Sequence, residues 1–169
     1  VDAAPWLPFD PRVVDFLAEL SAEVLRGPDT RRQEASAAFG FWCRRAHLEA
    51  LAARHASPLP RLGRGLAFHL APANVPALFA YTLAIGLLAG NANVVRLSSR
   101  RMEGEAPLLA ALRRVLERPE HAAVRARTSL ITYGRDDAVT ADYCARCDAR
   151  IVWGGDATVA AVRAMPMPP

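Results

Sequence analysis

The stretch HLAPANVPALFAYTLAIGLLAGNANVVRLSS, from His69 to Ser99, decides the fold, and it contains no arginine or acidic residue before Arg96. Short apolar runs at residues 66–70 and 93–97 flank an apolar segment of helical character at 75–89. That segment is about fifteen residues long, short of the roughly twenty that a bilayer-spanning helix needs. Asparagines and glycines at its two ends would also lack hydrogen-bond partners in lipid. The stretch therefore predicts a buried strand–helix–strand unit and no membrane span.

The same alternation continues after Ser99. The pattern predicts a helix at 104–118, a strand at 128–134, a helix at 136–147, a strand at 149–153 and the start of a helix at 156–165. Short apolar strands that alternate with helices are typical of right-handed crossover units, in which helices cover both faces of a parallel sheet. We therefore expect a fold of the α/β class.

The residues before the sheet predict helices only. Asp10 and Pro11 provide an N-cap and a first-turn proline for a helix that closes at Gly27, and residues 30–55 predict a second long helix. The proline- and glycine-rich residues 56–65 predict a connector. We accordingly expect an N-terminal helical segment at 1–60 that packs on a sheet domain at 61–169.

The composition argues against some classes of partner. The chain has 169 residues, which is about one domain. All 21 basic residues are arginines, the net charge is only +4, and the arginines are spread along the chain beside Asp and Glu. A nucleic-acid surface needs basic groups clustered on one face, with aromatic residues among them. We therefore expect no nucleic-acid partner.

The three cysteines, Cys43, Cys144 and Cys147, are too few for a disulfide framework in a chain of this length. Cys144 and Cys147 form a C-x-x-C pair, but zinc needs four ligands and no second pair exists. The pair also falls inside a predicted helix. We expect buried structural thiols, no metal site and a reduced, cytoplasmic setting. Because the chain starts without Met and ends in PMPP, we expect a piece of a longer protein.

Candidate binding residues follow three predicted strands, where open α/β sheets bind ligands. After the first strand, Asn74 either caps the next helix or stabilises an oxyanion with its amide. After the third, Gly154 and Gly155 allow backbone amides to approach a pyrophosphate, although the Asp156 carboxylate would repel it. After the second, hydroxyl and guanidinium groups predict an anion site: Arg96, Ser98, Ser99, Arg100 and Arg101. We expect the three loops to lie together and form one binding surface.

Several of these segments resemble the acyl-CoA reductase family, which includes the LuxC-type fatty acyl-CoA reductase of bacterial luminescence and is a branch of the aldehyde dehydrogenase superfamily. The resemblance rests on GLAFHLAPANVPALFAYTLAIGLLAGNANVVRLSSR, on the upstream PWLPFDPRVVDFLAELS and FGFWCRRAHL, and on the downstream RIVWGGD. It implies that residues 61–169 form an incomplete Rossmann-like domain for a nicotinamide cofactor. It also implies that the whole enzyme reduces an acyl thioester, such as an acyl-CoA, to an aldehyde.

The resemblance further implies roles for single residues. Asn74 matches the superfamily's asparagine whose amide helps to form the oxyanion hole. Arg96 stands where the superfamily usually has a lysine on the adenosine ribose, and Ser99 where many members have a glutamate that binds both ribose hydroxyls. Without that carboxylate, and with Arg100 and Arg101 nearby, NADPH is expected rather than NADH. The neighbouring loops supply the other expected cofactor contacts: Pro72, Ala73, Ser98, Gly134, Gly154 and Gly155.

In this family a nucleophilic cysteine takes the acyl group from CoA before hydride transfer, and it follows the WGG loop by some distance. Cys43, Cys144 and Cys147 all precede that loop. We therefore expect a cofactor-binding part that is inactive by itself, with Asn74 as its one catalytic contributor. A homo-oligomer and an acyl-transfer partner protein stay open. So do an NAD(P)-dependent aldehyde dehydrogenase that works in the oxidising direction and a non-catalytic module that keeps the fold for assembly.

Overall fold

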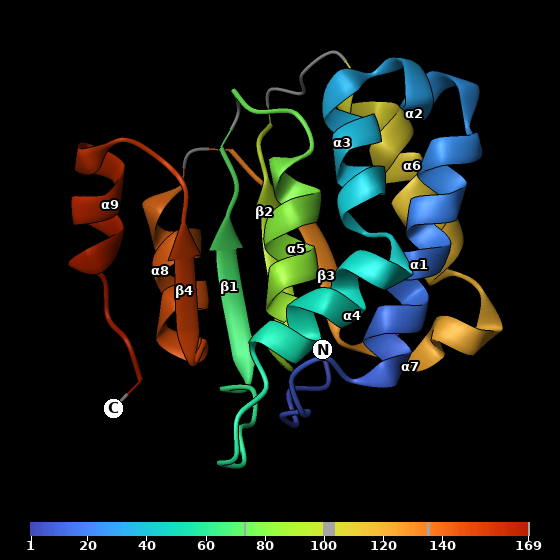
Figure 1. Cartoon of the computed structure of the whole chain (residues 1–169). Coiled ribbons are helices and arrows are strands. Elements are labelled where there is room, and N and C mark those ends of the chain that lie inside the picture. The colour runs from blue at the N-terminus through green and yellow to red at the C-terminus, as the bar shows by residue number, and fades with distance from the viewer. Residues whose placement is uncertain (73, 100–103, 135, 169) are drawn as a thin grey trace.

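The computed structural model describes residues 1–72, 74–99, 104–134 and 136–168, and it confirms an α/β fold with a Rossmann-like parallel sheet (Figure 1). Within those ranges the strands are β1 (Leu66–Leu70), β2 (Ala92–Leu97), β3 (Thr128–Thr132) and β4 (Ala149–Val152), in the order β3-β2-β1-β4. Every neighbouring pair is parallel. Each predicted strand therefore exists, and all of the loops that follow the strands lie at one edge of the sheet.

Helices cover the two faces of the sheet unequally (Figure 1). α5 (Leu78–Leu88) connects β1 to β2 and α6 (Glu105–Leu116) leads from β2 towards β3, and α1 (Pro11–Arg26) packs on both helices. The short η1 (Pro119–His121) and α7 (Ala122–Ala126) complete that connection. α8 (Asp137–Arg146) returns from β3 to β4 and contacts β1 on the opposite face, with α9 (Asp156–Arg163) beside it.

Side chains along each strand alternate between two cores, because successive residues of a strand point to opposite faces. Val95 and Leu97 of β2 join the larger core on the α5 side, which we call the thick layer; it also includes buried residues of α1, α3 (Glu34–Trp42), α5 and α6. The smaller core on the α8 side, the thin layer, consists of Phe68, Leu70, Val94, Cys144, Cys147 and Val162.

The prediction of a single long helix at 30–55 is wrong. The chain instead forms α2 (Pro28–Arg32), α3 and α4 (Arg45–Arg54), and the backbone is extended at Gln33 and Arg44 between them. These breaks let α3 pack back on α1, where Ser21 Oγ donates to the Gly40 carbonyl over 2.6 Å. Packing against α1 thus overrides the helical propensity of the sequence.

The helix predicted at 75–89 is shorter than expected, because α5 begins only at Leu78. The residue before it, Ala77, is buried and has a φ of 64°, a left-handed conformation that residues other than glycine rarely adopt. Cys147, expected inside a helix, is instead the extended C-cap of α8. No helix in the described ranges has both the length and the apolarity of a membrane span, and α5 has only 11 residues.

Candidate active site at the carboxyl edge of the sheet

The sheet has a topological switch point between β1 and β4. The chain leaves β1 towards α5 on one face and leaves β4 towards α9 on the other, although the two strands are parallel neighbours. The Trp153 amide donates to the Leu70 carbonyl over 3.1 Å and extends this pairing to the carboxyl ends of both strands. Open α/β sheets bind ligands in the crevice outside such a point. The topology therefore marks this edge as the candidate site.

A pocket of about 470 Å³ opens at this edge, on the α8 side. The ends of the strands and the first turns of α8 and α9 line it, among them Leu70, Arg96, Tyr133, Gly134, Asp136 and Thr158. Its volume lies within the range of roughly 300–1,000 Å³ that small-molecule sites occupy. Two residues predicted from the sequence to bind cofactor, Arg96 and Gly134, thus line one pocket.

Arg96 contributes the pocket's guanidinium group. Its Nη2 donates to the Tyr133 carbonyl over 3.1 Å, and the guanidinium carbon lies 5.1 Å from the centre of the Tyr133 ring. Its Nε is buried and has no hydrogen-bond partner within the described part of the chain. A buried donor without a partner costs about 1–3 kcal/mol. Arg96 lines the pocket, and guanidinium groups bind phosphates and other oxygen acceptors, so the residues present fit an anionic or hydroxylated ligand.

Tyr133 and Asp136 are pocket residues that the sequence analysis missed. The Tyr133 hydroxyl lies 3.0 Å from Thr140 Oγ1, and burial raises its pKa. Asp136 caps α8, because its Oδ1 accepts from the amides of Ala138 and Val139 over 3.0 Å each. The helix amides stabilise its negative charge. An Asp two residues after a strand-ending Tyr-Gly was the available signal for this cap.

Two glycines at this edge have room for a side chain among the described residues. A Cβ added at Gly134 or at Gly155 would meet no atom within 4 Å, and neither residue has a positive φ. Gly154 differs, because a Cβ there would lie 3.2 Å from the Thr158 side chain. A backbone that is open and unstrained yet lacks a side chain leaves room for a ligand to approach closely.

Asn74 lies exposed on the loop between β1 and α5, at the same edge. Because Ala77 is the N-cap of α5, the interpretation of Asn74 as a helix cap is wrong, and the interpretation as a substrate-facing amide stays a prediction. Pro72, Ser98 and Ser99 lie on the loops after β1 and β2. Three other predicted contacts, Ala73, Arg100 and Arg101, fall outside the described residues.

The three cysteines are buried. Cys43 follows α3 in the thick layer, whereas Cys144 and Cys147 lie at the end of α8. Burial raises the pKa of all three thiols. Because the thiolate is the nucleophilic form, these surroundings suit structural thiols.

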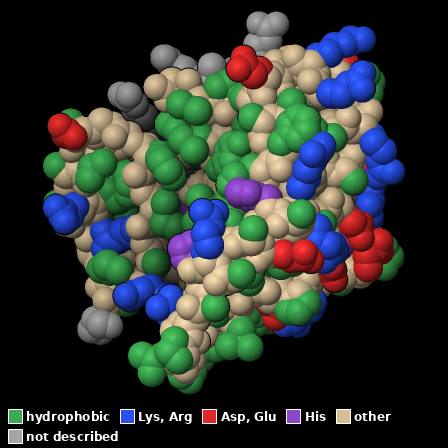
Figure 2. Space-filling view, viewed as in Figure 1, with side chains coloured by type: hydrophobic (Ala, Val, Ile, Leu, Met, Phe, Trp, Pro, Cys, Tyr) green, Lys and Arg blue, Asp and Glu red, His purple; other side chains and the backbone are tan. Residues whose placement is uncertain are grey.

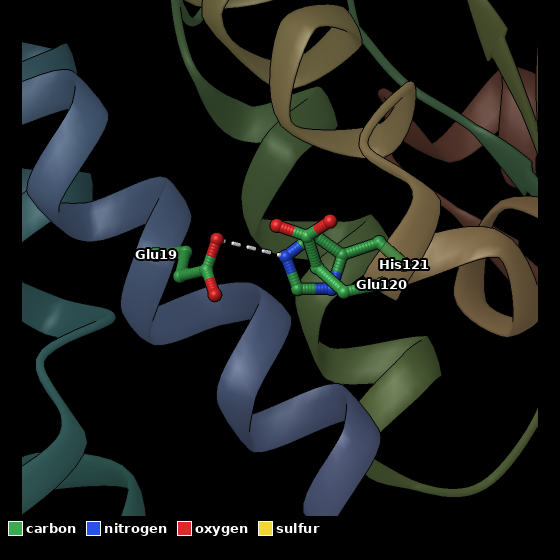
Figure 3. Close-up of side chains that lie close together, drawn as sticks. All are labelled: Glu19, Glu120 and His121. Atoms are coloured by element: carbon green, nitrogen blue, oxygen red, sulfur yellow. Dashed lines mark hydrogen bonds and ion pairs between the residues drawn. The ribbon is translucent and has the colours of Figure 1, made fainter.

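A separate cluster of possible metal ligands lies between α1 and η1 (Figure 3). Glu19 of α1 points towards His121, whose Nε2 is 3.0 Å from Glu19 Oε2, and the Glu120 side chain lies close by. Arg118 Nη1 donates to the same Glu19 oxygen over 2.8 Å. A cation would have to displace that guanidinium group, so we interpret the cluster as ion pairing between α1 and η1.

The arginines visible in Figure 2 are scattered over the surface, and acidic groups lie beside several of them on the right-hand side of the view. Salt bridges account for part of this pattern. Arg114 and Arg118 pair with Glu23, and Arg45 pairs with Asp15.

Two comparisons with known proteins place the fold and this edge in context. No curated protein matches the chain. The family model described as acyl-CoA reductase (LuxC) matches residues 42–169, a range that contains the four strands, the thin layer and the pocket. The chain belongs to the acyl-CoA reductase (LuxC) family.

Proposed function

We propose that this chain provides the dinucleotide site of an NADPH-dependent acyl-CoA reductase, an enzyme that reduces an acyl thioester to an aldehyde through a cysteine acyl-enzyme. The observation that supports this most is the pocket at the carboxyl edge, which the Arg96 side chain and the open backbone at Gly134 line together. A dinucleotide presents phosphates and ribose hydroxyls, which are the acceptors that such a donor needs.

The residues present divide the work of binding and catalysis. The bound dinucleotide would supply the hydride. Arg96 would hold the adenosine side of the cofactor, and the backbone after Gly155 would lie next to the pyrophosphate at the start of α9. Asn74 would donate its side-chain amide to the thioester oxygen and stabilise the negative charge that develops there.

The nucleophile would come from outside these residues. All three thiols are buried and have raised pKa values, so none is available as a thiolate to attack a thioester. With NADPH and an acyl-CoA, the chain alone is accordingly expected to form no aldehyde. Aldehyde formed at a rate above that of the C43S/C144S/C147S variant would contradict this assignment.

Calorimetry with NADPH and NADH tests the binding site. Saturable heat with a clear preference for NADPH is expected, and R96M is expected to weaken NADPH binding at least ten-fold. The control is R125M, because Arg125 is exposed on α7, which precedes β3 and lies towards the other edge of the sheet. G155A sharpens the test, because its added Cβ would meet no atom of the described residues within 4 Å apart from its chain neighbours. Its unfolding free energy should stay within about 1 kcal/mol, while NADPH affinity falls.

Two results would contradict the proposal. Without saturable heat from either dinucleotide, the pocket is no cofactor site. If NADH binds more tightly than NADPH, the assignment to NADPH fails even though the site stands.

A further inference from the structure

A chain of buried polar groups crosses the thick layer directly beneath the switch point. It joins Trp153, Thr82, His69 and Asn93, which come from the end of β4, from α5, from β1 and from β2. Three of the four side chains are at most 1% exposed: Thr82, His69 and Asn93. Buried polar groups in an otherwise apolar core are expensive unless every one is paired.

The direction of each hydrogen bond in this series follows from the hydrogen bond that Asn93 makes at one end of it. Asn93 Nδ2 donates to the Asn91 carbonyl over 2.9 Å, so Asn93 Oδ1 is the acceptor that faces His69 Nε2, 2.9 Å away. His69 Nε2 therefore holds the proton. Burial lowers the His69 pKa to about 4, which keeps the ring neutral and leaves Nδ1 as an acceptor.

The directions of the hydrogen bonds at the Trp153 end of this polar series are then fixed as well. The Thr82 hydroxyl donates to His69 Nδ1 over 2.7 Å, and its oxygen accepts the indole Nε1–H of Trp153 over 3.1 Å. Each of these bonds uses the donor or acceptor that the preceding bond leaves available. The neutral His69 thus orients the Thr82 hydroxyl, which in turn fixes one edge of the Trp153 indole.

Gly86 makes this arrangement possible. A Cβ at this position of α5 would overlap Asn93 Oδ1 and would lie 3.0 Å from His69 Cε1. The glycine therefore lets α5 approach the strands closely enough for Thr82 to reach His69. The packing of α5 is adapted to the polar chain.

The Trp153 indole, which these hydrogen bonds hold in place, is itself partly exposed to solvent. Trp153 is 39% exposed although its Nε1–H is paired, and it stands at the carboxyl end of β4 beside β1. The pocket with Arg96 lies on the α8 side of the sheet, whereas the Trp153 indole lies on the α5 side, against Thr82. Gly154 and Gly155 follow directly, on the way to α9. A ligand with two ring systems would therefore cross the edge of the sheet from the pocket to the indole.

We propose that Trp153 is the aromatic platform for the second ring of the dinucleotide, the nicotinamide, and that Thr82 and His69 are positioning residues that hold it. This inference rests on the proposed function, since it places the other half of the same cofactor. A fixed indole face offers the ring a stacking surface without an ordering cost at binding.

A protein in which Trp153 is the only tryptophan tests the platform. The variant W6F/W42F removes Trp6 and Trp42, which pack elsewhere, on Arg12 and Tyr81. Its emission is followed while NADP⁺ or 2′,5′-ADP is added, and calorimetry reports binding of each in the same samples. NADP⁺ is expected to quench at least half of the emission at saturation by contact with its electron-poor nicotinamide. Bound 2′,5′-ADP, which lacks that ring, should leave the emission unchanged.

The variant T82V tests the positioning. Valine keeps the shape of threonine but removes the hydroxyl that joins Trp153 to His69, so we expect NADP⁺ to bind about ten-fold more weakly and to quench less. Binding of 2′,5′-ADP should not change, which a general loss of structure would not allow. T82S, which keeps the hydroxyl, should behave as the parent protein.

Four results would overturn the inference in whole or in part. If NADP⁺ binds without quenching, Trp153 is no platform although the cofactor site stands. If T82V binds NADP⁺ as tightly as T82S does, Thr82 and His69 are not positioning residues. If both ligands quench equally, the contact is not with nicotinamide. If calorimetry shows that neither ligand binds, the proposed function fails and this inference fails with it.

Discussion

The two faces of the sheet differ in how the protein uses them. On the thick layer, helices from both halves of the chain bury α5, and side chains such as Phe16, Phe39 and Leu112 are at most 1% exposed. On the thin layer, α8 and α9 are the helices of the described residues that cover the strands, and most residues of α9 remain exposed. The pocket with Arg96 opens on this second side. The comparison suggests that one face provides stability, while the other stays loose enough to admit a ligand.

The switch point lies where the two faces meet. The polar chain from Trp153 to Asn93 belongs to the thick layer, whereas Gly154 and Gly155 lead into α9 of the thin layer. A deeply buried face thus positions a side chain at the rim of a more exposed one. Binding sites generally need this combination, because preorganisation lowers the cost of binding and local opening admits the ligand.

Replacing one buried phenylalanine on each face by alanine tests this comparison and gives the largest expected effect. Phe16 in the thick layer and Phe68 in the thin layer are both at most 1% exposed. We expect F16A to lower the unfolding free energy by about 4–5 kcal/mol and F68A by about 3 kcal/mol, because a cavity that can collapse costs less. Urea denaturation measures both values.

Amide hydrogen exchange supplies the control for these variants. F68A should speed exchange in α8, since Phe68 stacks on Tyr143 with ring centres 5.0 Å apart, and should leave α1 unaffected. If F68A costs more than F16A, or leaves exchange in α8 unchanged, the two faces do not differ as proposed.

The pH dependence of stability is the next largest effect. Burial holds the His69 pKa at about 4, below its ordinary value of 6.5, so the unfolded chain binds a proton between these values that the folded chain does not. Stability is then complete above pH 6.5 and falls as the pH drops towards 4. Because one pKa unit corresponds to about 1.4 kcal/mol, wild-type protein should lose about 3 kcal/mol over this window.

The variant H69Q isolates this contribution, since glutamine does not titrate. Glu19 and Asp10 also have lowered pKa values, the first mainly through the hydrogen bond with His121 and the second mainly through that with Arg12. Their effects belong mostly below about pH 4.5 and are present in both proteins. Equal slopes of unfolding free energy against pH between 6.5 and 4.5 for the two proteins would show that His69 is not buried in its neutral form.

The sequence predicted the strands well because each is a short apolar run between turn residues. It failed at Gln33, Arg44 and Leu78, where contacts with distant elements decide whether a helix continues. Local propensity has no information about such contacts. Helix boundaries were accordingly the weakest part of the prediction.

The candidate site was likewise predictable from the sequence only in part. Its loops were predictable, because all parallel strands end at one edge and polar or small residues follow each strand. The hydrogen-bonded series from Trp153 to Asn93 was not, since hydrogen bonds between residues 13 to 71 positions apart leave no periodic pattern. One signal existed: His69 and Asn93 are polar residues inside apolar strands, and both point to the face that α5 covers.

The reactivity of the three thiols gives the smallest effect and the sharpest measure of the difference between the faces. Cys43 is buried in the thick layer, and Cys144 and Cys147 in the thin layer. Burial raises all three pKa values, so a thiol reagent must await local opening of the structure. If α8 opens more readily than α3, Cys144 and Cys147 should be labelled about ten-fold faster than Cys43, as mass spectrometry of the modified peptides would show.

A ten-fold ratio of labelling rates corresponds to about 1.4 kcal/mol between the two opening reactions. Labelling in urea, where all three thiols are exposed, corrects for their intrinsic rates. Equal corrected rates would mean that the protein opens only as a whole, and the thin layer would then have to admit its ligand without separating from the sheet.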